Sequence, residues 1–254
     1  MSSSIFQFDS SQDFQLAAIQ SVVRLFEGQP RDAQALTNTL SGYLPGAEES
    51  ALLDFVRSFE VGAVGNNLMV DRDLVLANLQ NVQDANGLEI ASELVGDSFE
   101  FDIEMETGTG KTYVYLRTIF ELAKHYNLTK FVILVPSVAI REGVATSIRL
   151  MKDHFAEIYP ANPFEWQIYS GKNPEEVQGF ATSTSIQILI MTIDSIRGDA
   201  NNRVMHQTRD TLNGLKPVDY LKATRPIVIM DEPQNMESLL SQTSIGELDP
   251  AFTL

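Results

Sequence analysis

From about residue 98 onward, short apolar runs alternate with longer amphipathic stretches. The apolar runs have the length of strands, and the stretches 113–126 and 138–159 repeat their apolar residues at helical spacing. Such alternation is typical of βαβ units, which build a parallel sheet with helices on both faces. We therefore predict an α/β fold over 98–254, with a mostly parallel sheet flanked by helices. Its predicted strands are 98–105, 131–137, 165–170, 186–192 and 227–232.

Residues 31–97 lack strand-like runs and are rich in acidic side chains. Three segments show helical periodicity, and the last of them ends at Asn86 and Gly87, a pair typical of a helix C-cap. We predict that this region is an acidic helical insertion beside the α/β body, and that residues 1–30 form a separate N-terminal helical region. The predicted helices of the insertion are 33–44, 48–59 and 71–85.

The chain is strongly acidic, but its charge is unevenly spread. The formal net charge is −16, which argues against nucleic-acid binding because contacts with phosphates rest on Lys and Arg. The window 111–152 nevertheless carries seven bases against two acids. These bases form either a local anion-binding face or ordinary solvated helix charges, and the counts alone do not separate the two.

Composition also bears on the compartment. The first ten residues lack the basic and apolar regions of a secretory signal, and no apolar run approaches the roughly 20 residues needed to span a bilayer. The chain has no cysteine, which suits a reducing environment. We expect a cytoplasmic protein that makes no membrane contact.

A glycine-rich stretch, METGTGKT, follows the first predicted strand and opens the first predicted helix after it. In that context glycines let backbone amides turn toward an anion, and the helix N-terminus adds a favourable dipole. The lysine can reach the β- and γ-phosphates of a nucleotide, and the threonine after it can ligate Mg²⁺. We predict a phosphate-binding loop, against the alternative of a glycine-rich turn without a ligand; Met105 stands where the strict motif has glycine. The candidate residues are Thr107, Gly108, Thr109, Gly110, Lys111 and Thr112.

Two carboxylates end the last predicted strand, where the run IVIM leads straight into Asp231 and Glu232. Ligands of open α/β sheets bind at the carboxyl ends of the strands. Nucleotide hydrolysis needs a carboxylate near the metal and a group that activates water. Alone, such a pair is more often a solvated strand end. Together with the glycine-rich loop, it predicts that Asp231 holds Mg²⁺ and that Glu232 orients and deprotonates the attacking water.

Weaker signals lie outside these two motifs. Gln15, in FQLAAI, offers an amide that matches the N6 and N7 edge of adenine, although a glutamine on a helix is usually a surface residue. Side chains that follow the strands 131–137 and 186–192 are candidate contacts for the phosphates of DNA, against the alternative of ordinary strand-to-helix turns. These DNA candidates are Ser137, Arg141, Thr192, Ser195 and Arg197.

Taken in order, FQLAAI, METGTGKT, VPSVAIREGV and DEPQNM resemble the Q motif and motifs I, Ia and II of superfamily 2 helicases and translocases. More narrowly, METGTGKTYVYLRTIFEL, FVILVPSVAIREGV and DEPQ resemble the Res subunit of type III restriction enzymes. The resemblance implies a RecA-like P-loop domain, the first motor domain of an ATP-dependent endonuclease. It also implies that Gln15 recognises adenine and that Gln234 couples the nucleotide state to the rest of the motor. Lys111, Thr112, Asp231 and Glu232 keep the phosphate, metal and water roles given above.

The same resemblance implies partners beyond this chain. In the family a second motor domain supplies an arginine finger, a nuclease domain follows, and a separate Mod subunit recognises and methylates double-stranded DNA. The chain stops about where motif III is expected, so we expect a fragment that binds ATP and Mg²⁺ but hydrolyses ATP poorly by itself. Two alternatives remain: another superfamily 2 motor, such as a type I restriction motor or a repair helicase, and a non-catalytic nucleotide-responsive DNA-binding module.

Overall fold

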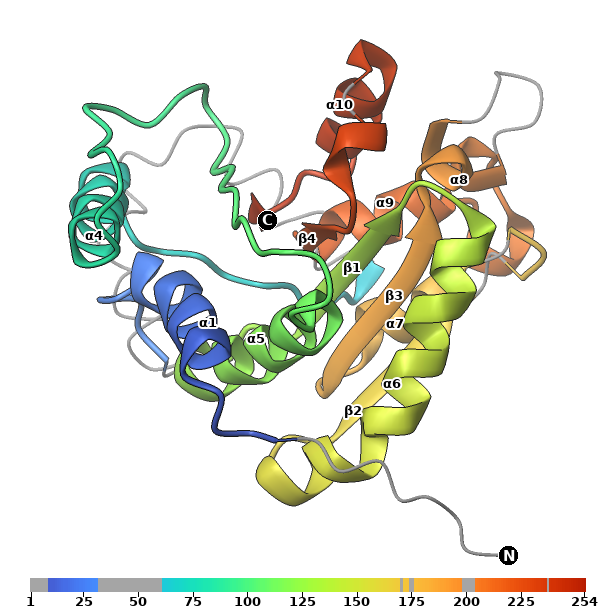
Figure 1. The fold of residues 1–254 in the computed structure, drawn as a ribbon. Helices are drawn as coiled ribbons and strands as arrows, with labels where there is room; N and C mark the ends of the chain where they lie inside the picture. The colour runs from blue at the N-terminus through green and yellow to red at the C-terminus, as the bar shows by residue number, and fades with distance from the viewer. Residues whose placement is uncertain (1–8, 32–60, 170, 174–175, 198–203, 237) are drawn as a thin grey trace, which may run out of the picture.

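The computed structural model describes the chain except for residues 1–8, 32–60, 170, 174–175, 198–203 and 237. Its centre is a five-stranded sheet in the order β2-β3-β1-β4-β5, in which every pair of neighbours is parallel. Figure 1 shows the long helices α5 and α6 in front of this sheet. The strands are β1 (Lys130–Val135), β2 (Phe164–Ile168), β3 (Ile186–Thr192), β4 (Ile227–Met230) and β5 (Phe252–Thr253).

Helices cover both faces of the sheet, because alternate residues of the central strands point to opposite sides. Ile133 of β1 belongs to a core with α1, α4, α5 and α6, whereas Val132 and Leu134 belong to a second core with α7, α8, α9 and α10. No helix in the described part of the chain is long and apolar enough to cross a membrane. The helices are α1 (Asp13–Leu25), α4 (Arg72–Ala85), α5 (Lys111–Tyr126), α6 (Val138–Ile158), α7 (Glu176–Thr182), α8 (Ile193–Arg197), α9 (Pro217–Ala223) and α10 (Leu239–Gly246), with short 3-10 turns η1 (Val204–His206), η2 (Asp210–Leu212) and η3 (Pro233–Asn235).

The predicted α/β fold with a mostly parallel sheet is confirmed. Four of its five predicted strands are present, 186–192 with the predicted bounds and the other three with bounds that differ by at most two residues. The predicted strand 98–105 is wrong. Only Glu100 forms an isolated parallel bridge, to Thr253, supported by backbone hydrogen bonds from Phe101 to Thr253 and from Thr253 to Phe99. This segment lies at the edge of the sheet beside a strand of two residues, so most of its length has nothing to pair with.

Part of the predicted helical insertion can be placed. The predicted helix 71–85 is confirmed as α4, with Asn86 as its C-cap and Gly87 at a positive φ of 67°. The predicted helices 33–44 and 48–59 lie outside the described residues. The division of the chain at residues 30 and 97 remains a prediction.

The strand order brings distant loops to one edge of the sheet. Residues 99–101 lie beside β5, which separates them from β4, and β4 pairs with β1. All these segments are parallel, so the loops that follow them leave from the same, carboxyl edge. The glycine-rich loop, the acidic pair after β4 and the turn after β1 are therefore neighbours.

Candidate functional site

The glycine-rich loop is shaped by two residues that adopt left-handed backbone conformations. Gly108 has φ 83° and Gly110 has φ 86°, a region that favours glycine. Gly110 is also the N-cap of α5 and supplies no capping side chain, so the amides of the first helical turn are left for a ligand. Thr109 closes the loop by donating its hydroxyl to the carbonyl of Glu106 at 2.6 Å. The loop has the form of an anion cradle, and Lys111, which opens the helix, is exposed beside it.

Gln15 reaches this loop from α1. Its side chain is 7% exposed, and its Nε2 donates to the carbonyl of Thr109 at 2.9 Å. A Cβ added to Gly110 would lie only 2.7 Å from that nitrogen, so any other residue there would displace the Gln15 amide from the loop. Gln15 thus contacts the loop directly, while its recognition of adenine remains a prediction.

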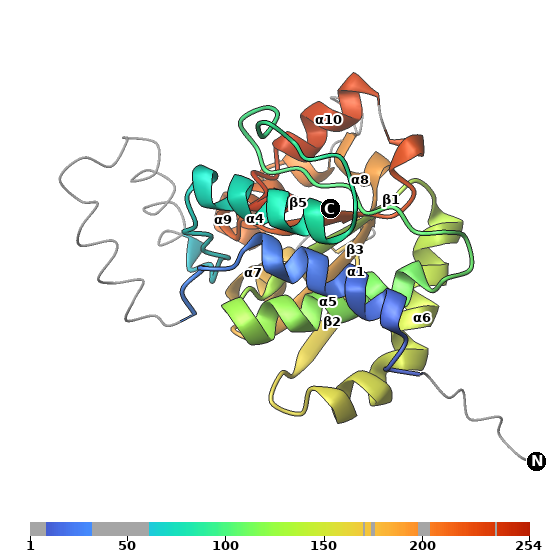
Figure 2. The same ribbon diagram turned by 60° about the vertical axis from the view of Figure 1, so that its left-hand side comes forward.

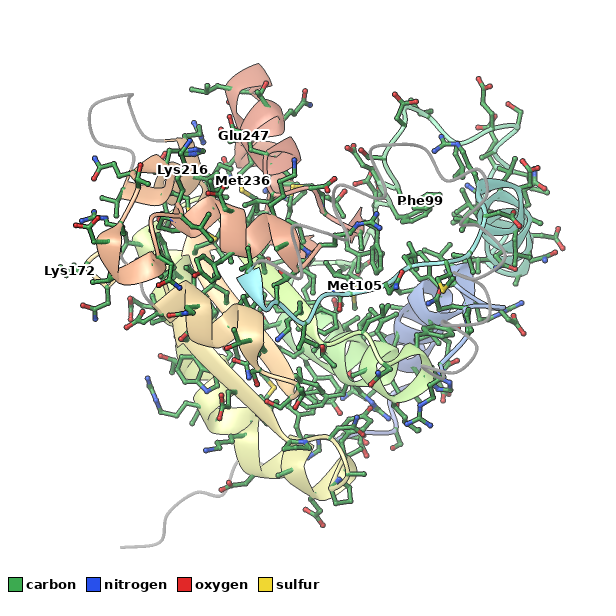
Figure 3. The ribbon with its side chains drawn as sticks, turned by 180° about the vertical axis from the view of Figure 1, so that it is seen from behind. Phe99, Met105, Lys172, Lys216, Met236 and Glu247 are labelled. Atoms are coloured by element: carbon green, nitrogen blue, oxygen red, sulfur yellow. The ribbon has the colours of Figure 1, made fainter. Side chains whose placement is uncertain are left out.

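Helix α1 is held in place along α5. Figure 2 shows α1 between α4 and α5. The Tyr126 hydroxyl donates to the carbonyl of Val23 at 2.7 Å, and the guanidinium of Arg117 donates to the carbonyl of Ser10 at 2.6 Å. Met105, labelled in Figure 3, packs with α1 residues from the loop side. The position of Gln15 is therefore fixed from both ends of α1.

Asp231 begins the loop after β4. Its backbone amide donates to the carbonyl of Leu134 at 3.0 Å, which fixes the half-buried carboxylate at the sheet edge. Burial raises the pKa of Asp231, and the charge of Glu232 adds to this, whereas a hydrogen bond from Tyr115 and the charge of Lys111 act in the opposite direction. Burial thus disfavours the charged form of the carboxylate, and a cation bound there would stabilise that form.

Glu232 has an unusual backbone, with φ 60° and ψ 58°. Non-glycine residues avoid this left-handed region, and three of the five that adopt it among the described residues are the tolerant types Asn and Asp. Strained residues of this kind are concentrated at functional sites. The side chain of Glu232 is exposed, as is that of Gln234 in η3. The backbone therefore supports a functional role for Glu232 independently of its sequence motif.

This strain can be measured. We expect the Glu232→Gly variant to be more stable to unfolding than Glu232→Ala by about 1 kcal/mol, because a left-handed conformation costs a residue with a Cβ roughly 1–2 kcal/mol. Both variants lose the same side chain, so the difference in urea midpoint reports the backbone. Glu157, exposed on α6, is the matched control, where glycine should be worse than alanine by about 1 kcal/mol. Equal stability of the two variants at 232 contradicts the strained backbone.

The predicted DNA contacts meet at the same sheet edge, because β1 and β3 are paired and Val135 lies beside Thr192. Each candidate nevertheless has a partner within the protein, which an ordinary turn also provides, so the DNA roles of these residues remain predictions. Ser137, the N-cap of α6, accepts a hydrogen bond from the amide of Ile140 at 3.3 Å, and Arg141 pairs with Glu142 at 2.9 Å. The hydroxyls of Thr192 and Ser195 lie 2.9 Å apart, and Arg197 lies 4.0 Å from Asp194.

Tyr115 is a site residue that the sequence motifs did not reveal. Its hydroxyl donates to Oδ2 of Asp231 at 3.3 Å. Burial raises the pKa of the Tyr115 phenol, the Asp231 charge raises it further, and a side-chain hydrogen bond with Thr112 acts in the opposite direction. Tyr115 follows Thr112 by three residues on α5, a spacing that places both side chains on one face of the helix. This spacing is the sequence feature that could have indicated Tyr115 as a site residue.

The residues fit a metal held together with phosphates. In the described part of the chain, no three His, Asp or Glu side chains gather into a ready-made metal site. Mg²⁺ commonly binds through one or two protein side chains and completes its coordination with water and phosphate oxygens. Thr112 and Asp231 form such a minimal set, since Asp231 accepts a hydrogen bond from Tyr115, which shares a face of α5 with Thr112. A hollow of about 1040 Å³ lies between α1, α4 and residues 100–106; it reaches the loop at Glu106 and Thr109, but Lys111, Thr112 and Asp231 do not line it.

Comparisons with known proteins identify the family of this chain. The family model "Type III restriction enzyme, res subunit" matches residues 72–251, which begin at the first residue of α4. The Res subunit of the type III restriction-modification enzyme EcoP15I from Escherichia coli is 33% identical over 177 residues, covering 61% of this chain and 18% of that protein.

Two further relatives are similar. The StyLTI Res subunit of Salmonella typhimurium is 34% identical over 162 residues, covering 57% of this chain and 16% of the relative. The EcoPI Res subunit of Escherichia phage P1 is 30% identical over 177 residues, covering 61% and 18%. The chain thus spans less than a fifth of the length of each relative. Because the family model covers more than half of its residues, the chain belongs to the family of type III restriction enzyme Res subunits.

Proposed function

We propose that this chain is the first, nucleotide-binding part of the motor of a type III restriction enzyme. It binds ATP with Mg²⁺ and, within the assembled enzyme, hydrolyses ATP to move on double-stranded DNA and so to permit cleavage by a nuclease domain. One observation carries the proposal: the anion cradle of 105–112 follows the segment 99–101, the Asp231–Glu232 pair follows β4, and these two segments flank β5 on opposite sides, with the charge of Lys111 acting on Asp231.

The position of each residue supports the role that we give it. The loop amides and Lys111 hold the phosphates, and Thr112 and Asp231 hold Mg²⁺, which neutralises charge on the phosphates when bound. Glu232, exposed next to Asp231, orients the attacking water and accepts its proton. Gln15 lies at the loop on a fixed helix, where it can recognise adenine.

The proposal extends to DNA and protein partners. Ser137, Arg141, Thr192 and Ser195 lie along the sheet edge next to the nucleotide residues, so DNA bound there would be close to the site of hydrolysis. The chain has a net charge of −16, so its own contact with DNA should be weak and sensitive to salt. A Mod methyltransferase subunit would supply recognition of the DNA site. Gln234, exposed after the acidic pair, would pass the nucleotide state to the rest of the motor.

Nucleotide binding by the full chain tests the proposal. A fluorescent ATP analogue with Mg²⁺ should bind saturably, and ATP and ADP should displace it. Adenosine lacks the charged phosphates, and hydrogen bonds to charged groups contribute about 1.5–3 kcal/mol each, so it should compete at least about tenfold less well. Absence of saturable binding, or equal competition by adenosine, contradicts a phosphate-binding loop.

A further inference from the structure

Tyr115 occupies a position between the two halves of the proposed site. It lies on α5 three residues after Thr112, and its hydroxyl donates to Asp231, 116 residues further along the chain. Thr112 precedes it by about one helical turn on the same face of α5 and acts on the pKa of its phenol. Tyr115 therefore contacts one of the two side chains to which the proposed function gives the metal and shares a helix face with the other, although it lies outside both motifs.

The contact leaves the carboxylate able to bind a cation. An ionised carboxylate has about four lone-pair sites, and a single hydroxyl donor occupies one of them. A tyrosine donor is also neutral, so it orients the carboxylate without replacing the cation, as a lysine or arginine would. The distance of 3.3 Å is longer than the common range of about 2.5–3.0 Å for such bonds. Hydrogen bonds of active sites are often long before the ligand binds and shorten in the complex.

We propose that Tyr115 is a positioning residue that keeps the Asp231 carboxylate directed toward Thr112, so that the magnesium complex of the nucleotide is favoured over the free nucleotide. This inference rests on the proposed function. The ring of Tyr115 packs against the core under α5, and phenylalanine would keep that packing. The hydroxyl alone is therefore open to test.

The test is Tyr115→Phe in the full chain, with the affinity for a fluorescent ADP analogue measured in Mg²⁺ and in EDTA. We expect the affinity in EDTA to change by less than about twofold, because the phosphate-binding amides and Lys111 are untouched. The gain in affinity on adding Mg²⁺ should fall about threefold to tenfold, the effect of losing one neutral hydrogen bond. Tyr113→Phe is the matched control, since that hydroxyl lies 3.1 Å from His154 of α6 on another side of the same helix.

A double-mutant cycle separates positioning from a general effect on the fold. If Tyr115 acts through Asp231, then Tyr115→Phe should have no further effect on the magnesium-dependent gain in an Asp231→Asn background. An unchanged gain in Tyr115→Phe, an equal loss in EDTA, or additive losses in the cycle would each overturn the role of Tyr115 and leave the proposed function standing. A wild-type chain whose nucleotide binding does not respond to Mg²⁺ overturns the role of Tyr115, and one that binds no nucleotide overturns both proposals.

Discussion

Replacement of Lys111 by alanine is expected to weaken the binding of ATP and ADP by about tenfold to hundredfold, because a hydrogen bond to a charged group contributes about 1.5–3 kcal/mol. Lys111 opens α5 directly after the two glycines whose positive φ values shape the loop, and its charge already acts on Asp231. The side chain is exposed, so its loss should leave the folded structure intact. Titration with a fluorescent nucleotide measures the change, and urea unfolding confirms that the variant is folded.

Lys124→Ala is the matched control for this variant. Lys124 lies in the last turn of the same helix, its side chain is 53% exposed, and it pairs with Glu121 at 3.5 Å. Its removal changes the net charge by the same amount but at the opposite end of α5, so nucleotide affinity should stay within about twofold because the interaction of separated exposed charges is screened by salt. Equal affinities of the wild type and Lys111→Ala would sink the phosphate-loop assignment.

The central strands were predictable because their surroundings are uniform along their length. Every residue of β1 and β3 is buried, so continuous apolar runs such as FVILV and ILIM mark them without ambiguity. The segment 98–105 misled for the opposite reason. Its alternating apolar and acidic residues fit a strand with one solvated face, but a strand also needs a partner, and β5 offers only Phe252 and Thr253. Pairing partners are a property of the tertiary fold, and local periodicity does not contain them.

The same distinction separates the predicted site residues from the missed one. The glycines and Lys111 are contiguous, so a motif of a few residues determines the loop that they form. The bonds from Gln15 to Thr109 and from Tyr115 to Asp231 join residues 94 and 116 positions apart, and they exist only because α1, α5 and β4 are packed together. The left-handed backbone of Glu232 was equally invisible, because nothing in the residue type favours it.

In the assembled enzyme with DNA, Glu232→Gln is expected to reduce ATP hydrolysis by about 10²–10⁴-fold, the usual contribution of a general base. The amide has the size of the carboxylate but does not accept the proton of the attacking water. Nucleotide affinity should change little, because the loop amides, Lys111 and Asp231 remain. The steady-state rate with saturating DNA measures the effect, and Glu157→Gln, an exposed glutamate on α6, should hydrolyse ATP at the wild-type rate.

The choice of glutamine separates chemistry from backbone strain at this position. Glutamine has a Cβ and experiences the same left-handed strain as the native glutamate, so Glu232→Gln keeps the conformation and removes only the ability to take a proton. Glu232→Gly relieves the strain and removes the carboxylate together, and a loss of activity in that variant alone would have two explanations. If both Glu232→Gln and Glu232→Gly bind nucleotide but lose ATP hydrolysis, the lost rate is due to the missing carboxylate. DNA-stimulated hydrolysis that persists in Glu232→Gln excludes Glu232 as the base, and a wild-type enzyme that binds ATP without hydrolysing it favours a nucleotide-responsive binding module over a motor.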